Sequence, residues 1–91
     1  MPDIDITASD RHEYAVTIAA DDGTRTEHRV RVPESLLEQL GLAATQEPLL
    51  VRASMLYLLE REPASSVLPS FGLDDIARYF PDYPTEIGNW I

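Results

Sequence analysis

The first third of this chain alternates apolar and polar residues with a period of two, and this pattern restricts the fold more than any other feature. The large apolar residues of this part fall at even positions: Ile4, Ile6, Tyr14, Val16, Ile18, Val30 and Val32. Successive side chains of a strand point to opposite faces of a sheet, so this spacing predicts strands with one buried face. We expect three strands, around 4–6, 14–18 and 28–32.

The second and third strands are predicted to form a hairpin. Their apolar side chains share one face only if the connecting loop has an odd number of residues. A three-residue loop at 21–23 (DDG), with its glycine in the left-handed conformation, meets this condition. It places Tyr14 opposite Val30 on one face and Glu13 opposite Arg31 on the other. Opposite charges therefore face each other across the polar side.

The apolar spacing becomes helical after Pro33, which cannot continue a ladder. A short first helix is predicted to contain Leu36, Leu37 and Leu40 and to end at Gly41. A second helix is predicted from a cap at Thr45 to about Arg61, because Pro63 then stops it.

Two further helices are predicted near the C-terminus. The third has one apolar stripe, formed by Leu73, Ile76, Ala77 and Phe80, and ends at Pro81. We expect Asp74 and Arg78 to form an i,i+4 pair on its flank. The last helix is predicted to be capped by Asp82 and to carry Ile87, Trp90 and Ile91.

These elements predict an α+β fold in which an N-terminal three-stranded antiparallel β-meander packs against about four short α-helices. The chain has 91 residues. That length leaves little room for a second core, so we expect a single domain over 1–91. The meander occupies 1–33 and the helical part 34–91.

The predicted second helix is apolar around nearly its whole circumference, and such a helix must be buried on all sides. A three-stranded sheet and a few short helices offer little material to enclose it. We therefore expect homodimerisation through this helix, with Val51, Met55, Leu58 and Leu59 at the interface.

The composition disfavours several functional classes. The chain has no cysteine, and seven Arg with no Lys against 16 Asp and Glu give a net charge of −9. Such a charge repels nucleic acid and anionic membranes. The acidity fits solubility or adaptation to habitat, and it also fits a basic partner. The N-terminus lacks a signal-peptide pattern and no apolar run reaches the ~20 residues of a membrane helix, so we expect a cytoplasmic protein with no membrane association.

No catalytic or metal-binding pattern stands out in the sequence. His12 and His28 are expected on the hairpin, on the face of Tyr14, without a third metal ligand, so ordinary strand residues explain them. The serines lack a nucleophile motif, and no glycine-rich loop could cradle a phosphate. We expect neither an enzyme nor a cofactor.

Two features remain as candidates for binding a partner. Arg25, Arg29 and Arg31 recur at alternate positions of the third strand, and a solvated face paired with Glu13 also explains them. Tyr79, Tyr83 and Trp90 belong to a C-terminal segment rich in aromatic residues, where either core packing or an interface accounts for them.

The C-terminal half resembles a family of small uncharacterised bacterial proteins. The resemblance covers most of residues 28–87 and lies in the "VRVPE" turn and the segments "RAS", "LLEREP" and "RYFPDY". That family has no assigned activity, so the resemblance supports element boundaries alone. Gly72 departs from its pattern, where Asp is more usual, and this puts the start of the third helix in question.

A shorter segment, "HRVRVPESLLEQLGL", is similar to the strand, proline and helix of AbrB-type transcription factors and antitoxins. That resemblance implies DNA binding through basic residues, and only Arg25, Arg29 and Arg31 match that role. The sequence as a whole predicts a protein-interaction or accessory module that acts as a homodimer. A DNA-binding regulator or antitoxin is the alternative.

Overall fold

Four strands form one sheet in the computed structural model, which describes residues 3–90 and so leaves Ile91 outside the described part. The strands lie in the order β1-β2-β3-β4, with bounds Asp3–Asp10, Glu13–Ala19, Arg25–Arg31 and Ser70–Gly72. The first three form the predicted antiparallel meander, and β4 pairs with β3 in parallel. The α+β class is confirmed.

The predicted β2–β3 register is confirmed in every pair. Tyr14 lies opposite Val30, and Glu13 lies opposite Arg31. The loop closes through the Ala20 amide, which donates to the Thr24 carbonyl at 2.8 Å. Gly23 has φ of 90°, which places it in the left-handed region as the three-residue loop requires.

His12 does not lie on a strand, contrary to our expectation. It lies in the β1–β2 turn with φ of 58°, and among the described residues no other non-glycine has a positive φ. Its carbonyl accepts a hydrogen bond from the Val32 amide at 2.7 Å, so the turn is fixed to the end of β3. A left-handed residue with a Cβ costs roughly 1–2 kcal/mol, and surrounding contacts must offset that cost.

The short strand β4 was not predicted from the sequence. Val30 pairs with Phe71, and the Arg29 amide donates to the Pro69 carbonyl at 2.8 Å. Three residues are too few to show a periodic pattern, and a parallel partner 41 residues away leaves no local signal. This strand fixes the start of the third helix beside the sheet.

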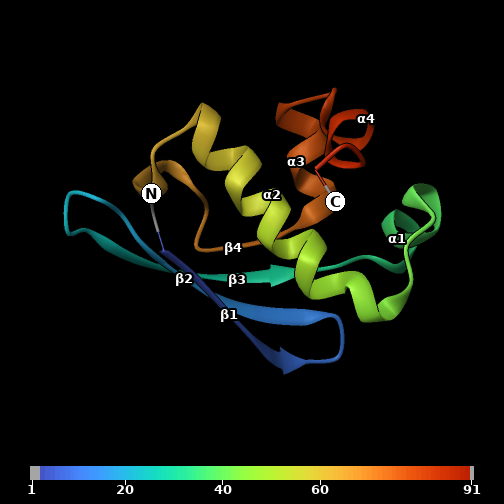
Figure 1. Ribbon diagram of the computed structural model, residues 1–91, viewed down its shortest axis with the longest axis horizontal. Coiled ribbons are helices and arrows are strands. Elements are labelled where there is room, and N and C mark those ends of the chain that lie inside the picture. The colour runs from blue at the N-terminus through green and yellow to red at the C-terminus, as the bar shows by residue number, and fades with distance from the viewer. Residues whose placement is uncertain (1–2, 91) are drawn as a thin grey trace.

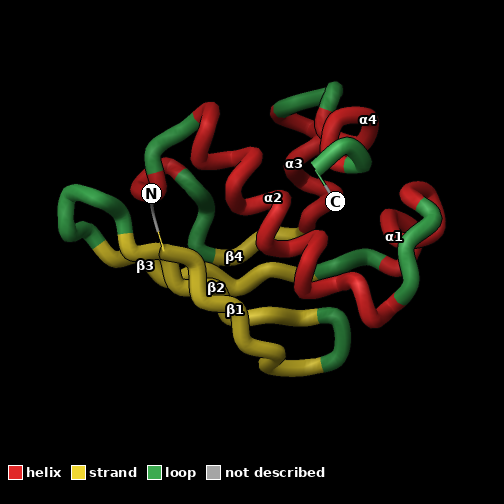
Figure 2. Tube along the Cα trace, in the orientation of Figure 1, coloured by secondary structure: helices red, strands yellow, loops and turns green. Residues whose placement is uncertain are grey.

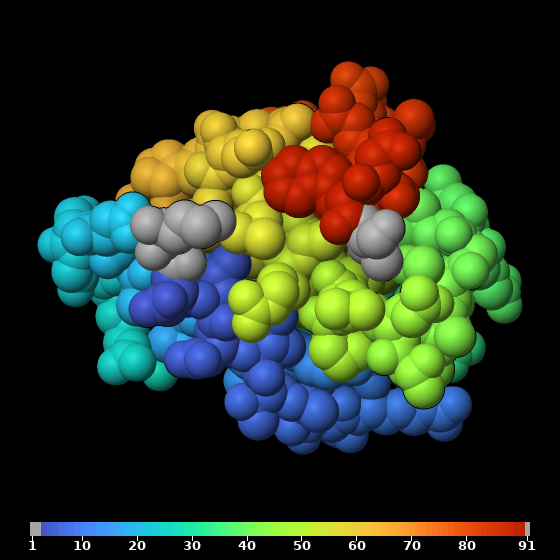
Figure 3. Space-filling model, in the orientation of Figure 1, coloured from blue at the N-terminus to red at the C-terminus, as the bar shows by residue number. Residues whose placement is uncertain are grey.

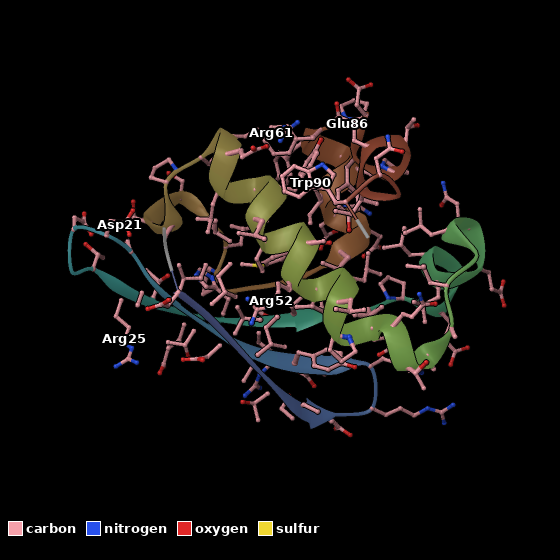
Figure 4. The ribbon with its side chains drawn as sticks, in the orientation of Figure 1. Asp21, Arg25, Arg52, Arg61, Glu86 and Trp90 are labelled. Carbon is pink, nitrogen blue, oxygen red and sulfur yellow. The ribbon has the colours of Figure 1, made fainter. Side chains whose placement is uncertain are left out.

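All helices lie on one side of the sheet, and α2 crosses over it with α3 and α4 beside α2 (Figures 1 and 2). The helices are α1 (Glu34–Leu40), α2 (Glu47–Arg61), α3 (Leu73–Tyr79) and α4 (Tyr83–Ile87), with short 3-10 turns η1 (Ala44–Gln46) and η2 (Ala64–Ser66). Gly41 ends α1 in the left-handed conformation, as predicted. Arg52 of α2 donates to the Ile4 carbonyl of β1 at 3.0 Å (Figure 4).

Three local predictions about the helices are wrong. Thr45 lies within η1, so α2 begins later, and the Gln46 side chain accepts from the Ala43 amide instead. Asp82 precedes α4 without a capping bond from its side chain. Arg78 contacts Asp75 at 3.8 Å, three residues away, where we expected Asp74.

The core lies between the sheet and α2. Its buried members come from every strand and from the four α-helices, and the largest fully buried side chains include Tyr57, Tyr83, Ile18, Leu50 and Met55. The Cα radius of gyration is 12.2 Å, the value expected of a compact chain of this length. No helix in the described part is long and apolar enough to cross a membrane.

The surface predicted for dimerisation through α2 is enclosed by the chain itself. Val51 and Met55 have no exposed area and Leu58 is 6% exposed, so these side chains are not available to a second chain in this fold. Leu59 is half-buried against the same core. The sheet, η2, α3 and α4 cover more of α2 than its apolar circumference led us to expect.

Candidate protein-binding groove

The three aromatic residues predicted to bind a partner have three different environments. Tyr83 is fully buried, so its assignment to a binding surface is wrong. Trp90 packs edge-on against Tyr57, with ring centroids 6.0 Å apart, and remains 37% exposed. Tyr79 is 69% exposed, and among the three it alone extends most of its ring into solvent.

Tyr57 is the centre of the aromatic cluster that holds the C-terminal helices to α2. Its ring meets Phe80, Tyr83 and Trp90 edge to face, with centroids 5.3–6.1 Å apart. Arg61 lies over the Tyr57 ring at 3.6 Å and donates to Glu86 of α4 at 2.8 Å (Figure 4). The C-terminal segment, red in Figure 3, accordingly lies against the yellow second half of α2. Most C-terminal aromatics therefore serve core packing.

The three arginines of β3 lie exposed on the open face of the sheet (Figure 4 labels Arg25). Arg29 contacts Glu13 at 3.3 Å, and Arg31 donates to the Ser70 hydroxyl at 3.4 Å. Glu27 is exposed on the same face. This face of β3 therefore carries both charges, and the acidic side chains reduce the positive potential of the arginines.

A groove opens between the end of α2, the segment through η2, β4 and α3. Apolar side chains form most of its lining: Leu58, Val67, Leu68, Phe71, Ile76, Tyr79 and Phe80. Glu62, Ser66 and Asp75 contribute the polar part. Leu68 is 48% exposed, so it and Tyr79 bring two large apolar groups to the surface in one groove.

Leu68 is held by a fixed backbone. Its carbonyl accepts from Nδ1 of the buried His28 at 2.8 Å, and the other ring nitrogen lies 2.9 Å from the Thr26 hydroxyl. A carbonyl can only accept, so Nδ1 carries a proton and donates to Leu68. The next carbonyl, that of Pro69, is bound to the Arg29 amide. An exposed leucine on so constrained a segment loses little entropy when it contacts a partner.

The groove is suited to a side chain and too small for a cofactor. Its volume is about 180 Å³. Sites for drug-sized ligands have roughly 300–1,000 Å³, while an apolar cavity of about 150 Å³ accommodates benzene. One leucine or phenylalanine side chain matches this space. The arrangement therefore resembles the anchor pockets of protein interfaces.

A second cluster surrounds His12, just beyond the C-terminal end of β3. Its Nδ1 lies 2.6 Å from Oε2 of the buried Glu47, and its Nε2 lies 3.0 Å from Oε1 of the exposed Glu34. The Tyr14 hydroxyl donates to Glu47 Oε1 at 2.9 Å. Burial, together with donation to this carboxylate, raises the pKa of Tyr14 to about 12. Arg11 lies 3.6 Å from Glu34 and 3.4 Å from His12 Nε2.

The His12 cluster joins the β1–β2 turn to the starts of α1 and α2. Both ring nitrogens are occupied by carboxylates, so the imidazole has no free nitrogen for a substrate. No group of three or more metal-binding side chains suited to an ion occurs in residues 3–90. This geometry serves as a clamp, and it offsets the strain of the left-handed His12.

Tyr79 is among the residues predicted from the sequence to bind a partner, whereas Leu68 and the groove as a whole were not predicted. The groove walls come from α2, η2, β4 and α3, which meet only in the folded chain. Leu68 lies in a stretch of turn-forming residues with no periodic pattern. The one available signal was a lone leucine beside Pro69, which is too common to indicate a site.

Comparisons of the chain with protein-family models, with characterised proteins and with solved structures found no match. The geometry of the groove is therefore the basis for assigning a function.

Proposed function

We propose that this chain is a protein-interaction module that binds its partner through the groove. One observation carries the proposal: Leu68 and Tyr79 remain exposed at an apolar groove while comparable side chains nearby are buried. Interfaces are enriched in tyrosine, and their strongest contacts are apolar or aromatic anchors in pockets.

The proposal keeps a protein partner and changes the surface that binds it. Tyr79 stays in the site, Tyr83 leaves it and Leu68 joins it. Self-association through Val51, Met55 and Leu58 loses its basis because the chain itself covers these residues. DNA binding through the β3 arginines is supported less, because Glu13 and Glu27 share their face.

Peptide selection tests the proposal. A random peptide library displayed on phage is selected against the wild-type protein, and the recovered peptides are measured on a Leu68→Ser/Tyr79→Ser variant. Both residues are exposed, so the double variant keeps the fold. We expect at least tenfold weaker binding, because an anchor contact is worth more than about 1.4 kcal/mol.

Leu49→Ser is the matched control. Leu49 is 56% exposed on α2 and does not line the groove, so its replacement removes a similar apolar area elsewhere. Peptides should bind this variant as they bind the wild type. If no recovered peptide depends on Leu68 and Tyr79, the proposal is wrong.

A further inference from the structure

The acidic side chains of the groove specify the partner more closely than its apolar walls do. Glu62 lies at the C-terminal end of α2 and lines the groove with an intermediate exposure. In the described part of the chain its carboxylate has no hydrogen-bond or ion-pair partner. A carboxylate without such a partner is free to accept a charge-assisted hydrogen bond from a cation placed in the groove.

Asp75 is the second carboxylate of the groove, and its charge is partly compensated. It accepts from the Gly72 amide at 3.0 Å and contacts Arg78 at 3.8 Å. No arginine lines the groove, and the chain as a whole has a net charge of −9. The groove therefore combines an apolar pocket with a negative local potential.

From this combination we infer that the groove binds a peptide segment in which a leucine- or phenylalanine-sized side chain is followed or preceded by Arg or Lys. The inference rests on the proposed function and narrows its partner to a basic, apolar segment. The apolar side chain fills the pocket, and the cation contacts Glu62 and the Tyr79 ring.

A second copy of this chain is a poor occupant of the groove. Each copy carries a charge of −9, so association would bring two acidic surfaces together. Acidic partners are disfavoured for the same reason, because like charges placed opposite each other weaken a complex. The excess of acidic residues would therefore favour basic partners over acidic ones.

Short capped dipeptides test the inference by NMR titration of the labelled protein. N-acetyl-Phe-Arg-amide and N-acetyl-Phe-Glu-amide present the same apolar group beside opposite charges. At low salt we expect the first to bind about two- to fivefold more tightly, the ratio that an ion pair at a partly exposed site provides. The amide shifts should centre on residues that line the groove.

Two variants test whether a preference for the Arg dipeptide comes from Glu62 or from the net charge of the protein. Glu62→Gln should remove most of the preference for Arg while the phenylalanine still binds. Glu38→Gln removes one acid on α1, away from the groove, and should leave the preference unchanged.

The outcomes distinguish this inference from the proposed function. Equal binding of the two dipeptides within the groove overturns the preference for a basic segment and leaves the apolar groove intact. Absence of binding by both dipeptides also overturns the inference, and peptide selection then decides the proposed function independently. A preference that survives Glu62→Gln would overturn the role given to Glu62 in selecting a basic segment.

Discussion

Tyr79 and Tyr83 lie four positions apart in the sequence but have opposite environments. Tyr83 has no exposed area, and its hydroxyl lies 2.6 Å from Ser54 Oγ. Ser54 gives its only proton to the Leu50 carbonyl at 2.7 Å, so Tyr83 must donate to Ser54. Tyr79 makes no comparable contact with the core and is mostly exposed.

Truncation of these two tyrosines should therefore have opposite results. Tyr83→Ala is expected to destabilise the fold by about 3–5 kcal/mol, because it leaves a large cavity beside Tyr57. Tyr79→Ala should change the free energy of unfolding by less than about 0.5 kcal/mol. Urea unfolding followed by circular dichroism measures both. A stable Tyr83→Ala protein would contradict the buried position of this ring.

The burial of Tyr83 should also lower the free energy of unfolding at high pH. Burial raises its pKa to about 12 from the ordinary 10.0. Below pH 10 the ring is neutral in both states, so its full contribution is present. Between pH 10 and 12 only the unfolded chain ionises, and roughly 2–3 kcal/mol of stability is lost as pH rises. Tyr83→Phe should lose less stability through this window than the wild type does. Parallel losses in the two proteins would rule this explanation out.

At the scale of elements, the sequence was most informative where a pattern repeats over several residues. The β2–β3 register followed from alternation and one glycine, and the end of α1 at Gly41 followed from a single left-handed residue. Elements without a repeat, β4 and the two 3-10 turns, left no signal. The role of His12 also escaped prediction, because its carboxylate partners are 22 and 35 residues away.

If the His12 cluster holds the β1–β2 turn in place, replacing His12 should lower the stability of the fold. His12→Ala removes both carboxylate contacts, keeps the left-handed strain and leaves Glu47 buried with only Tyr14 as partner. We expect a loss of about 1–3 kcal/mol. His12→Gly loses the same contacts but relieves the strain, so it should be more stable than His12→Ala by about 1 kcal/mol. Denaturant unfolding at pH 7 compares them, and equal stabilities of both variants and wild type would refute the clamp.

On the scale of the whole molecule, the net charge of −9 and the mixed charges of the open sheet face disfavour binding to DNA. Fluorescence anisotropy with mixed-sequence duplex DNA should show no saturable binding at low salt, since phosphate contacts require clustered cations. Binding that falls steeply with salt and disappears in an Arg25→Gln/Arg29→Gln/Arg31→Gln variant would favour the regulator instead.

The groove is also a property of the whole molecule, because four separate segments build it around a pocket of about 180 Å³. The C-terminal aromatics were predicted as one group, and the sequence could not separate Tyr83, which packs inside, from Tyr79, which stays outside. That distinction depends on the position of α3 and α4 against α2, which the Tyr57 cluster fixes.

The most direct test of the groove is to locate a bound apolar group within it. The measurement is a search for intermolecular nuclear Overhauser effects between N-acetyl-phenylalanine amide and the labelled methyl groups of the protein. We predict contacts to the methyl groups of Leu58, Val67, Leu68 and Ile76, which line the groove. Contacts to methyl groups elsewhere, or none at millimolar concentration, would contradict the assignment of this groove as a binding site.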